Sequence, residues 1–128
     1  MKIIKAAACA VLCLSALCAC GKNIENYRIY DDLVPSFTSA LSARTLKDEK
    51  ITKSEDGRRI ISASYTYKSK KPEEDMENYL YYMLNNKEAA FLADNKVAYD
   101  SRDPDNAIVI TVSSDEKTFT INITREER

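Results

Sequence analysis

The sequence predicts a small single domain of the α+β class, with elements in the approximate order α-β-β-α-β-β-β. Three observations favour this class. Two segments repeat apolar residues at helical spacing, Asp56-Gly57 separates two strand-like runs, and the last two runs of the chain alternate apolar and polar residues. Because the expected strands follow one another through short turns, we expect an antiparallel sheet with the helices packed on one face.

The first expected helix covers residues 33–43. Four apolar residues recur at four-residue spacing: Ile29, Leu33, Phe37 and Leu41. This spacing places them on one face of a helix. Pro35 suits the first turn of a helix, and the acidic pair Asp31-Asp32 suits its N-terminal end.

A β-hairpin is expected next, because residues 45–54 and 58–68 flank Glu55-Asp56-Gly57. The second run places alternate residues on one face: Ile61, Ala63, Tyr65 and Tyr67. The first run is much more polar, so we interpret it as an edge strand.

The second helix is expected to begin at Pro72, because proline suits the first helical position and three acidic residues follow it. Its apolar stripe comprises Met76, Tyr79, Leu80, Met83 and Leu84. Ala90 and Phe91 continue the stripe, so the helix is expected to end near Asp94-Asn95, with Asn85-Asn86 as a candidate kink or break.

Three strands complete the expected fold. A short one covers residues 96–100. The next carries Ile108, Ile110 and Val112, and the last covers residues 118–124. In the last strand, alternation points Phe119 and two isoleucines towards the core and the threonines outwards.

Composition excludes several kinds of site. The chain has no histidine, which excludes Ser-His-Asp and Cys-His catalysis and histidine-ligated zinc. It has only two glycines, which excludes a glycine-rich phosphate-binding loop. We expect no catalytic residue and no cofactor. Basic and acidic residues are interspersed without a basic stripe, so nucleic acid is not an expected partner.

The N-terminus has the pattern of an export signal. Lys2 and Lys5 precede an apolar run over residues 6–17. A bilayer-spanning helix needs about 20 apolar residues, so this run is too short to span a membrane and indicates a secretory signal instead.

The run closes with Leu17-Cys18-Ala19-Cys20. This sequence resembles the lipobox of bacterial lipoprotein precursors, a resemblance that covers about the first 22 residues. It implies cleavage before Cys20 and a diacylglyceryl group on the Cys20 sulfur. The alternative is an ordinary secretory signal with a chance cysteine. Gly21, in place of aspartate, does not meet the family's rule for retention in the inner membrane.

The expected organisation therefore has three parts. Residues 1–19 form a signal peptide that is removed, residues 20–28 contain the lipidated Cys20 and a short polar tether, and residues 29–128 form the globular domain. Two acyl chains hold a protein durably on a membrane, whereas one binds only marginally. We expect the protein on the extracytoplasmic face of the cell membrane or on the outer membrane.

Three sets of side chains are candidates for binding. Tyr65, Tyr67, Tyr79 and Tyr82 are candidates for a binding groove, with core packing as the alternative. Asp100, Asp103 and Asp105 are a weak candidate for a cation site, with a solvated turn as the alternative. Basic residues at the two ends of the second hairpin strand are candidates for contact with anionic lipid, with a solvated face as the alternative: Arg58, Arg59, Lys68, Lys70 and Lys71.

The function expected from these features is that of a non-enzymatic binding or accessory lipoprotein of the bacterial envelope. Its partner would be an envelope protein, an envelope polymer or a small ligand. The alternative is a structural subunit of an envelope assembly, in which an exposed strand pairs with a neighbour. A hydrolase that uses neither histidine nor cysteine is the third hypothesis.

Overall fold

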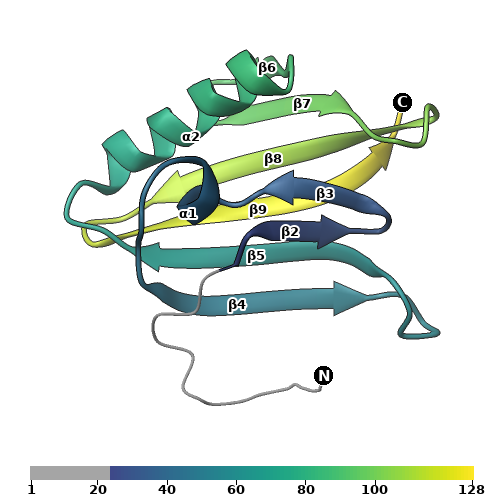
Figure 1. The fold of residues 1–128 in the computed structure, drawn as a ribbon, viewed down its shortest axis with the longest axis horizontal. Helices are drawn as coiled ribbons and strands as arrows, with labels where there is room; N and C mark the ends of the chain where they lie inside the picture. Colours follow the sequence, from purple (N-terminus) through teal and green to yellow (C-terminus); the bar gives the residue numbers. More distant parts are fainter. Residues whose placement is uncertain (1–23) are drawn as a thin grey trace.

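The computed structural model describes residues 24–128, so the expected signal peptide and Cys20 lie outside the described residues. A six-stranded antiparallel sheet forms the centre of the fold, in the order β4-β5-β9-β8-β7-β6 (Figure 1). Its strands are β4 (Leu46–Lys53), β5 (Ile60–Lys68), β6 (Ala90–Ala93), β7 (Lys96–Asp100), β8 (Asn106–Ser114) and β9 (Thr118–Glu127).

A second layer lies over one face of this sheet (Figure 1). It consists of a two-stranded hairpin and two helices: β2 (Asn26–Ile29), β3 (Asp32–Pro35), α1 (Phe37–Ala40) and α2 (Pro72–Asn86). Residues 26–28, expected in the tether, therefore belong to β2. Neither helix in residues 24–128 is long and apolar enough to cross a bilayer.

The prediction of an α+β domain with helices packed on one face of the sheet is wrong, because the covering layer contains the β2–β3 hairpin beside the two helices (Figure 1). Strands contain 50% of the described residues and helices only 18%, so the fold is β-rich. The element order is β-β-α-β-β-α-β-β-β-β. Two segments that the sequence pattern assigned to helices are strands instead, and each has an identifiable physical cause.

The first of these segments is the expected helix over residues 33–43. Its first part lies in β3, and only the four residues of α1 are helical. Tyr30 has a φ of 53°, which turns the chain tightly between β2 and β3. The hairpin buries alternate residues such as Tyr27, Ile29 and Val34, whereas Leu33 is 49% exposed. The four-residue spacing thus runs across three elements, because Ile29 lies in β2, Leu33 in β3 and Phe37 in α1.

The second segment follows α2. The helix ends at Asn86, where the N–H groups of Lys87 and Ala89 both donate to the carbonyl oxygen of Met83. Glu88 then adopts a φ of 55° and directs the chain away from the helix axis. The expected continuation through Phe91 is wrong because that residue lies in β6, opposite Val97 of β7.

The core lies between the two layers. Across the sheet, Tyr65 faces Ile121 and Ile121 faces Val112, so this register places the apolar positions of neighbouring strands on one face. All three are buried. The other face is polar, and the hydroxyls of Thr66 and Thr120 hydrogen-bond across it at 2.9 Å.

A buried carboxylate ties the β2–β3 hairpin to the sheet. Asp32 accepts hydrogen bonds from the Ser101 hydroxyl at 2.6 Å and from the Arg102 N–H at 2.8 Å. The guanidinium of Arg125 lies 3.6 Å from the centre of the Tyr30 ring. The hairpin is therefore attached at its turn as well as through the core.

Candidate functional site: a basic hollow at one end of the sheet

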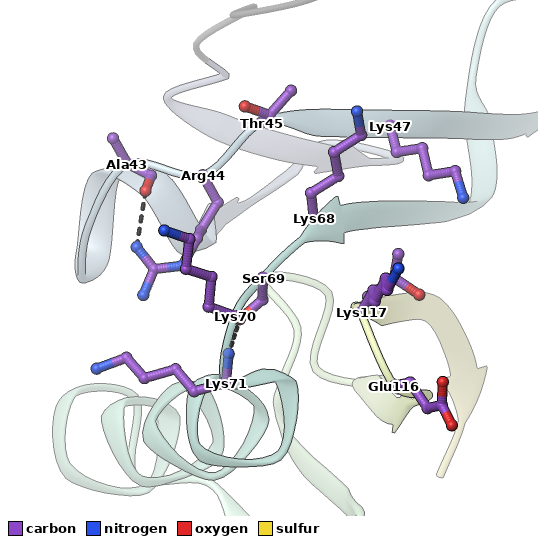
Figure 2. A pocket seen from close by; sticks show the side chains of 11 residues that line it. Ala43, Arg44, Thr45, Lys47, Lys68, Ser69, Lys70, Lys71, Glu116 and Lys117 are labelled. Carbon is purple, nitrogen blue, oxygen red and sulfur yellow. Dashed lines mark hydrogen bonds between the residues drawn. The ribbon is translucent and has the colours of Figure 1, made fainter.

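Three segments distant in sequence meet at one end of the sheet. They are residues 43–47, which include the start of β4, residues 68–71, which run from the end of β5 to α2, and residues 116–118, which lead into β9. Backbone hydrogen bonds join them, from the Lys68 N–H to the Thr45 carbonyl and from the Ser69 N–H to the Lys117 carbonyl. Together they line an open hollow of about 1050 Å³ (Figure 2).

A partly buried ion pair stabilises the wall of this hollow. Arg44 donates to both oxygens of the Asp75 carboxylate, at 2.8 and 2.9 Å. The Ser69 hydroxyl donates to the same carboxylate at 2.5 Å and accepts the N–H of Lys71. Burial by itself would raise the pKa of Asp75, but the hydrogen bonds from Arg44 and Ser69 outweigh it and lower the pKa. These contacts hold Arg44, Ser69 and Asp75 in place relative to one another.

The β8–β9 turn is built around Asp115. Its carboxylate accepts the N–H groups of Lys117 and Thr118 and the Thr118 hydroxyl. These hydrogen bonds, the one from Lys117 foremost, lower the pKa of Asp115, so it stays charged. This turn presents the Lys117 side chain to the hollow.

The lining is strongly cationic. Among residues 24–128, four exposed lysines of the hollow have no carboxylate within ion-pair distance: Lys47, Lys68, Lys70 and Lys117. Lys71 is paired with Glu74 at 2.9 Å. Glu116 is the acidic residue in the lining. The lysines come from all three segments (Figure 2), so only the folded chain assembles this surplus of positive charge.

The tyrosines proposed as a binding groove lie mostly in the core. Tyr65, Tyr67 and Tyr79 are buried, and Tyr82 is half-buried. The Tyr67 hydroxyl bonds that of Tyr27 at 2.6 Å, and the Tyr79 hydroxyl donates to the Pro35 carbonyl. Burial raises the pKa of Tyr67 to about 12. These contacts are those of core tyrosines whose hydroxyls have found internal partners.

The acidic loop has internal partners too. Asp100 forms an ion pair with Arg128 at 2.5 Å, and the Asp103 carboxylate accepts the N–H of Asp105. Within residues 24–128, no three acidic, histidine or cysteine side chains are grouped so as to hold a metal ion.

The basic residues singled out in the sequence are divided by the structure. Arg58 and Arg59 lie in the turn before β5, whereas Lys68 ends that strand and Lys70 and Lys71 follow it. Only the three lysines line the hollow. Sequence reasoning missed Arg44, Lys47 and Lys117. The signal that could have found Lys117 is its place in the turn before the last strand, which antiparallel pairing brings beside the end of β5.

The two buried carboxylates, Asp32 and Asp75, are engaged by different sets of donors. Comparison of the chain with protein-family models, with curated proteins and with solved structures finds no match. The chemistry available at the hollow is the binding of an anion by several ammonium groups on a rigid frame.

Proposed function

We propose that this protein is a lipid-anchored, non-enzymatic binding module of the bacterial envelope that takes an anionic ligand at its basic hollow. One observation carries the proposal. Three separate segments converge to place four exposed lysines around one hollow, and within residues 24–128 none of the four has a carboxylate within ion-pair distance. Leaving like charges together costs free energy unless an anion neutralises them, so such a cluster favours an anionic ligand.

The frame around the lysines supports the same function. Arg44 forms an ion pair with Asp75, so its charge stabilises the wall of the hollow, and the lysines are the groups available to bind the ligand. A lysine ammonium is a point charge on a flexible stem, which suits phosphate or carboxylate groups of varied geometry. The resemblance of residues 17–20 to a lipobox supports the anchored location.

The anchor has a direct test. Cells that express the protein are labelled with an alkyne fatty acid, and the purified protein is examined for the tag. The wild type and Cys18→Ala should be tagged, because Cys18 would leave with the signal peptide. Cys20→Ser should not be tagged, and persistent labelling of that variant would contradict the anchor.

The ligand class is tested with fluorescent polyphosphate as the probe. We expect the mature protein to bind it, with an affinity that falls as salt rises. Lys68→Ala combined with Lys117→Ala should weaken binding about tenfold, while the matched control Lys53→Ala, at the far end of β4, should not. Equal effects of the control and the paired variant would refute the site.

A specific observation also favours the alternative, a structural subunit. Strand β6 is an edge of the sheet, and three large side chains at or beside it are exposed: Tyr81, Phe91 and Leu92. The rings of the first two meet edge to face at 6.4 Å. An apolar edge strand is a template for pairing with another chain. Sedimentation velocity distinguishes the two functions, because a subunit should assemble with rising concentration and Leu92→Lys should prevent it.

A further inference from the structure

The described chain begins beside the basic hollow. The carbonyl oxygen of Ile24 accepts hydrogen bonds from the hydroxyls of Ser36 and Thr38, at the start of α1. Helix α1 in turn packs at the end of the sheet that carries the hollow, because the ring of Phe37 lies 4.8 Å from that of Phe119. The guanidinium of Arg44 lies 5.6 Å from the Phe37 ring. The chain therefore enters the fold at the end where the lysines gather.

The distance to the expected anchor is short. Four residue steps separate Cys20 from Ile24. A chain of that length reaches about 14 Å at most, even when fully extended. If Cys20 carries the lipid, the headgroups lie within that distance of Ile24, at the end of the domain that bears the hollow.

We propose that the basic hollow docks on the phosphate groups of anionic lipids in the membrane that holds the anchor. This inference rests on the proposed function, since it identifies the anionic ligand taken at the hollow. The orientation follows from the fold. The end of the sheet with Lys68, Lys70 and Lys117 faces the bilayer, and the end with the β4–β5 turn faces away from it.

A second hollow, at the other end of the sheet, is a useful comparison. It is lined by four arginines and two aspartates: Arg28, Arg59, Arg102, Arg125, Asp31 and Asp103. Two of these arginines have partners: Arg102 donates to the Asp31 carbonyl, and Arg125 lies near Asp32 and over the Tyr30 ring. The second hollow thus sets two aspartates among its four arginines, whereas Glu116 is the acidic residue that lines the basic hollow.

The contributions of the individual lysines to membrane binding add together, and each depends on salt. A basic residue near an anionic membrane surface strengthens binding by about fivefold, and the effect decays within a Debye length of about 10 Å at 0.1 M salt. The anchor keeps the lysines at a high effective concentration of headgroups, so even a few such contacts suffice to orient the domain.

The experiment uses the lipidated protein reconstituted in two kinds of vesicle, one of phosphatidylcholine alone and one containing about one third phosphatidylglycerol. A water-soluble acetylating reagent modifies accessible lysines, and mass spectrometry gives the rate at each. We expect Lys68, Lys70 and Lys117 to react about fivefold more slowly on the anionic vesicles, and Lys53 to react equally on both. Salt at about 0.5 M should abolish the difference.

Two further arms make the result specific. Lys68→Glu combined with Lys70→Glu should remove the protection of Lys117, whereas Lys53→Glu should leave it intact; circular dichroism checks that each variant is folded. Inorganic phosphate added to the phosphatidylcholine vesicles should give no protection, and protection there would mean that free phosphate is the ligand and overturn docking.

The remaining outcomes separate this inference from the proposed function. Equal rates on both vesicles, or equal protection of Lys53, would overturn docking. If polyphosphate still binds at the hollow in that case, the binding function stands and its ligand is a soluble or polymeric anion. If polyphosphate does not bind either, the proposed function fails as well.

Discussion

The hydroxyl of Tyr27 joins three parts of the core. It accepts the N–H of Phe37 at 3.1 Å, at the start of α1, and it bonds the Tyr67 hydroxyl of β5 at 2.6 Å. Its ring stacks on that of Tyr65 with centroids 4.0 Å apart. Tyr27→Phe keeps the stacked ring and removes only the oxygen, so it isolates the two hydrogen bonds.

Tyr27→Phe leaves two buried groups without partners, the Phe37 N–H and the Tyr67 hydroxyl. Each unsatisfied buried group costs about 1–3 kcal/mol, so we expect the free energy of unfolding to fall by about 2–6 kcal/mol. For a domain of this size, each kcal/mol lowers the melting temperature by roughly 4–8 °C. Tyr81→Phe is the matched control, because Tyr81 is 57% exposed and its loss of a hydroxyl should be nearly neutral.

A double-mutant cycle tests the reasoning most sharply. Tyr67→Phe alone should cost about 1 kcal/mol, because the Tyr27 hydroxyl keeps the Phe37 N–H as a partner. Added to Tyr27→Phe, the same substitution removes an orphaned hydroxyl, so the double variant should be no less stable than Tyr27→Phe. Urea unfolding followed by circular dichroism measures all four proteins. Purely additive losses, or a Tyr27→Phe variant as stable as the control, would refute this account.

Three further predictions concern charge and backbone. Because the pKa of Asp75 is lowered in the folded state, its contribution to stability is present above the unfolded-state pKa of about 3.9 and is lost as the pH falls through the folded-state pKa. Asp75→Asn should therefore be less stable at pH 7, and its urea midpoint should change less with pH in the acid range. Burial raises the pKa of Tyr67 to about 12, so the folded state holds this proton longer than the unfolded chain does, and stability should fall as the pH rises from about 10 towards 12. The tyrosinate absorbance that Tyr67→Phe removes should rise together with the loss of ellipticity rather than before it. Gly57 has a φ of +72° with open space around its missing Cβ, so Gly57→Ala should cost about 1–2 kcal/mol from the backbone alone, and a melting temperature equal to that of the wild type would contradict this.

The sequence is informative where periodicity and turn chemistry agree. The β4–β5 hairpin was predictable from Asp56-Gly57, and β9 from the strict alternation around Ile121. Both errors occurred where the chain turns through a left-handed residue that is not glycine. Tyr30 and Glu88 are the non-glycine residues with positive φ in residues 24–128, and each lies at the boundary that the pattern missed. Such residues are uncommon, and no local sequence signal announces them.

The candidate site was only partly predictable for a different reason. Lys68, Lys70 and Lys71 are neighbours in sequence, so their positive charge is visible without a structure. Lys47 and Lys117 join them through strand order, which a single sequence does not disclose. The role of the tyrosines was not predictable from the sequence. A period of two places Tyr65 and Tyr67 on one face of a strand, but that face can line a binding groove or pack in the core.

The hydrogen bonds that hold Ile24 to Ser36 and Thr38 determine how the domain bears a mechanical load. If the chain is anchored at Cys20 as proposed, a pull on the domain enters at the β2–β3 hairpin rather than at a strand of the six-stranded sheet. The force reaches that sheet through the hairpin's packing and through the Asp32 contacts with Ser101 and Arg102. The hairpin thus takes up tension first, and the sheet behind it can stay intact while the hairpin yields.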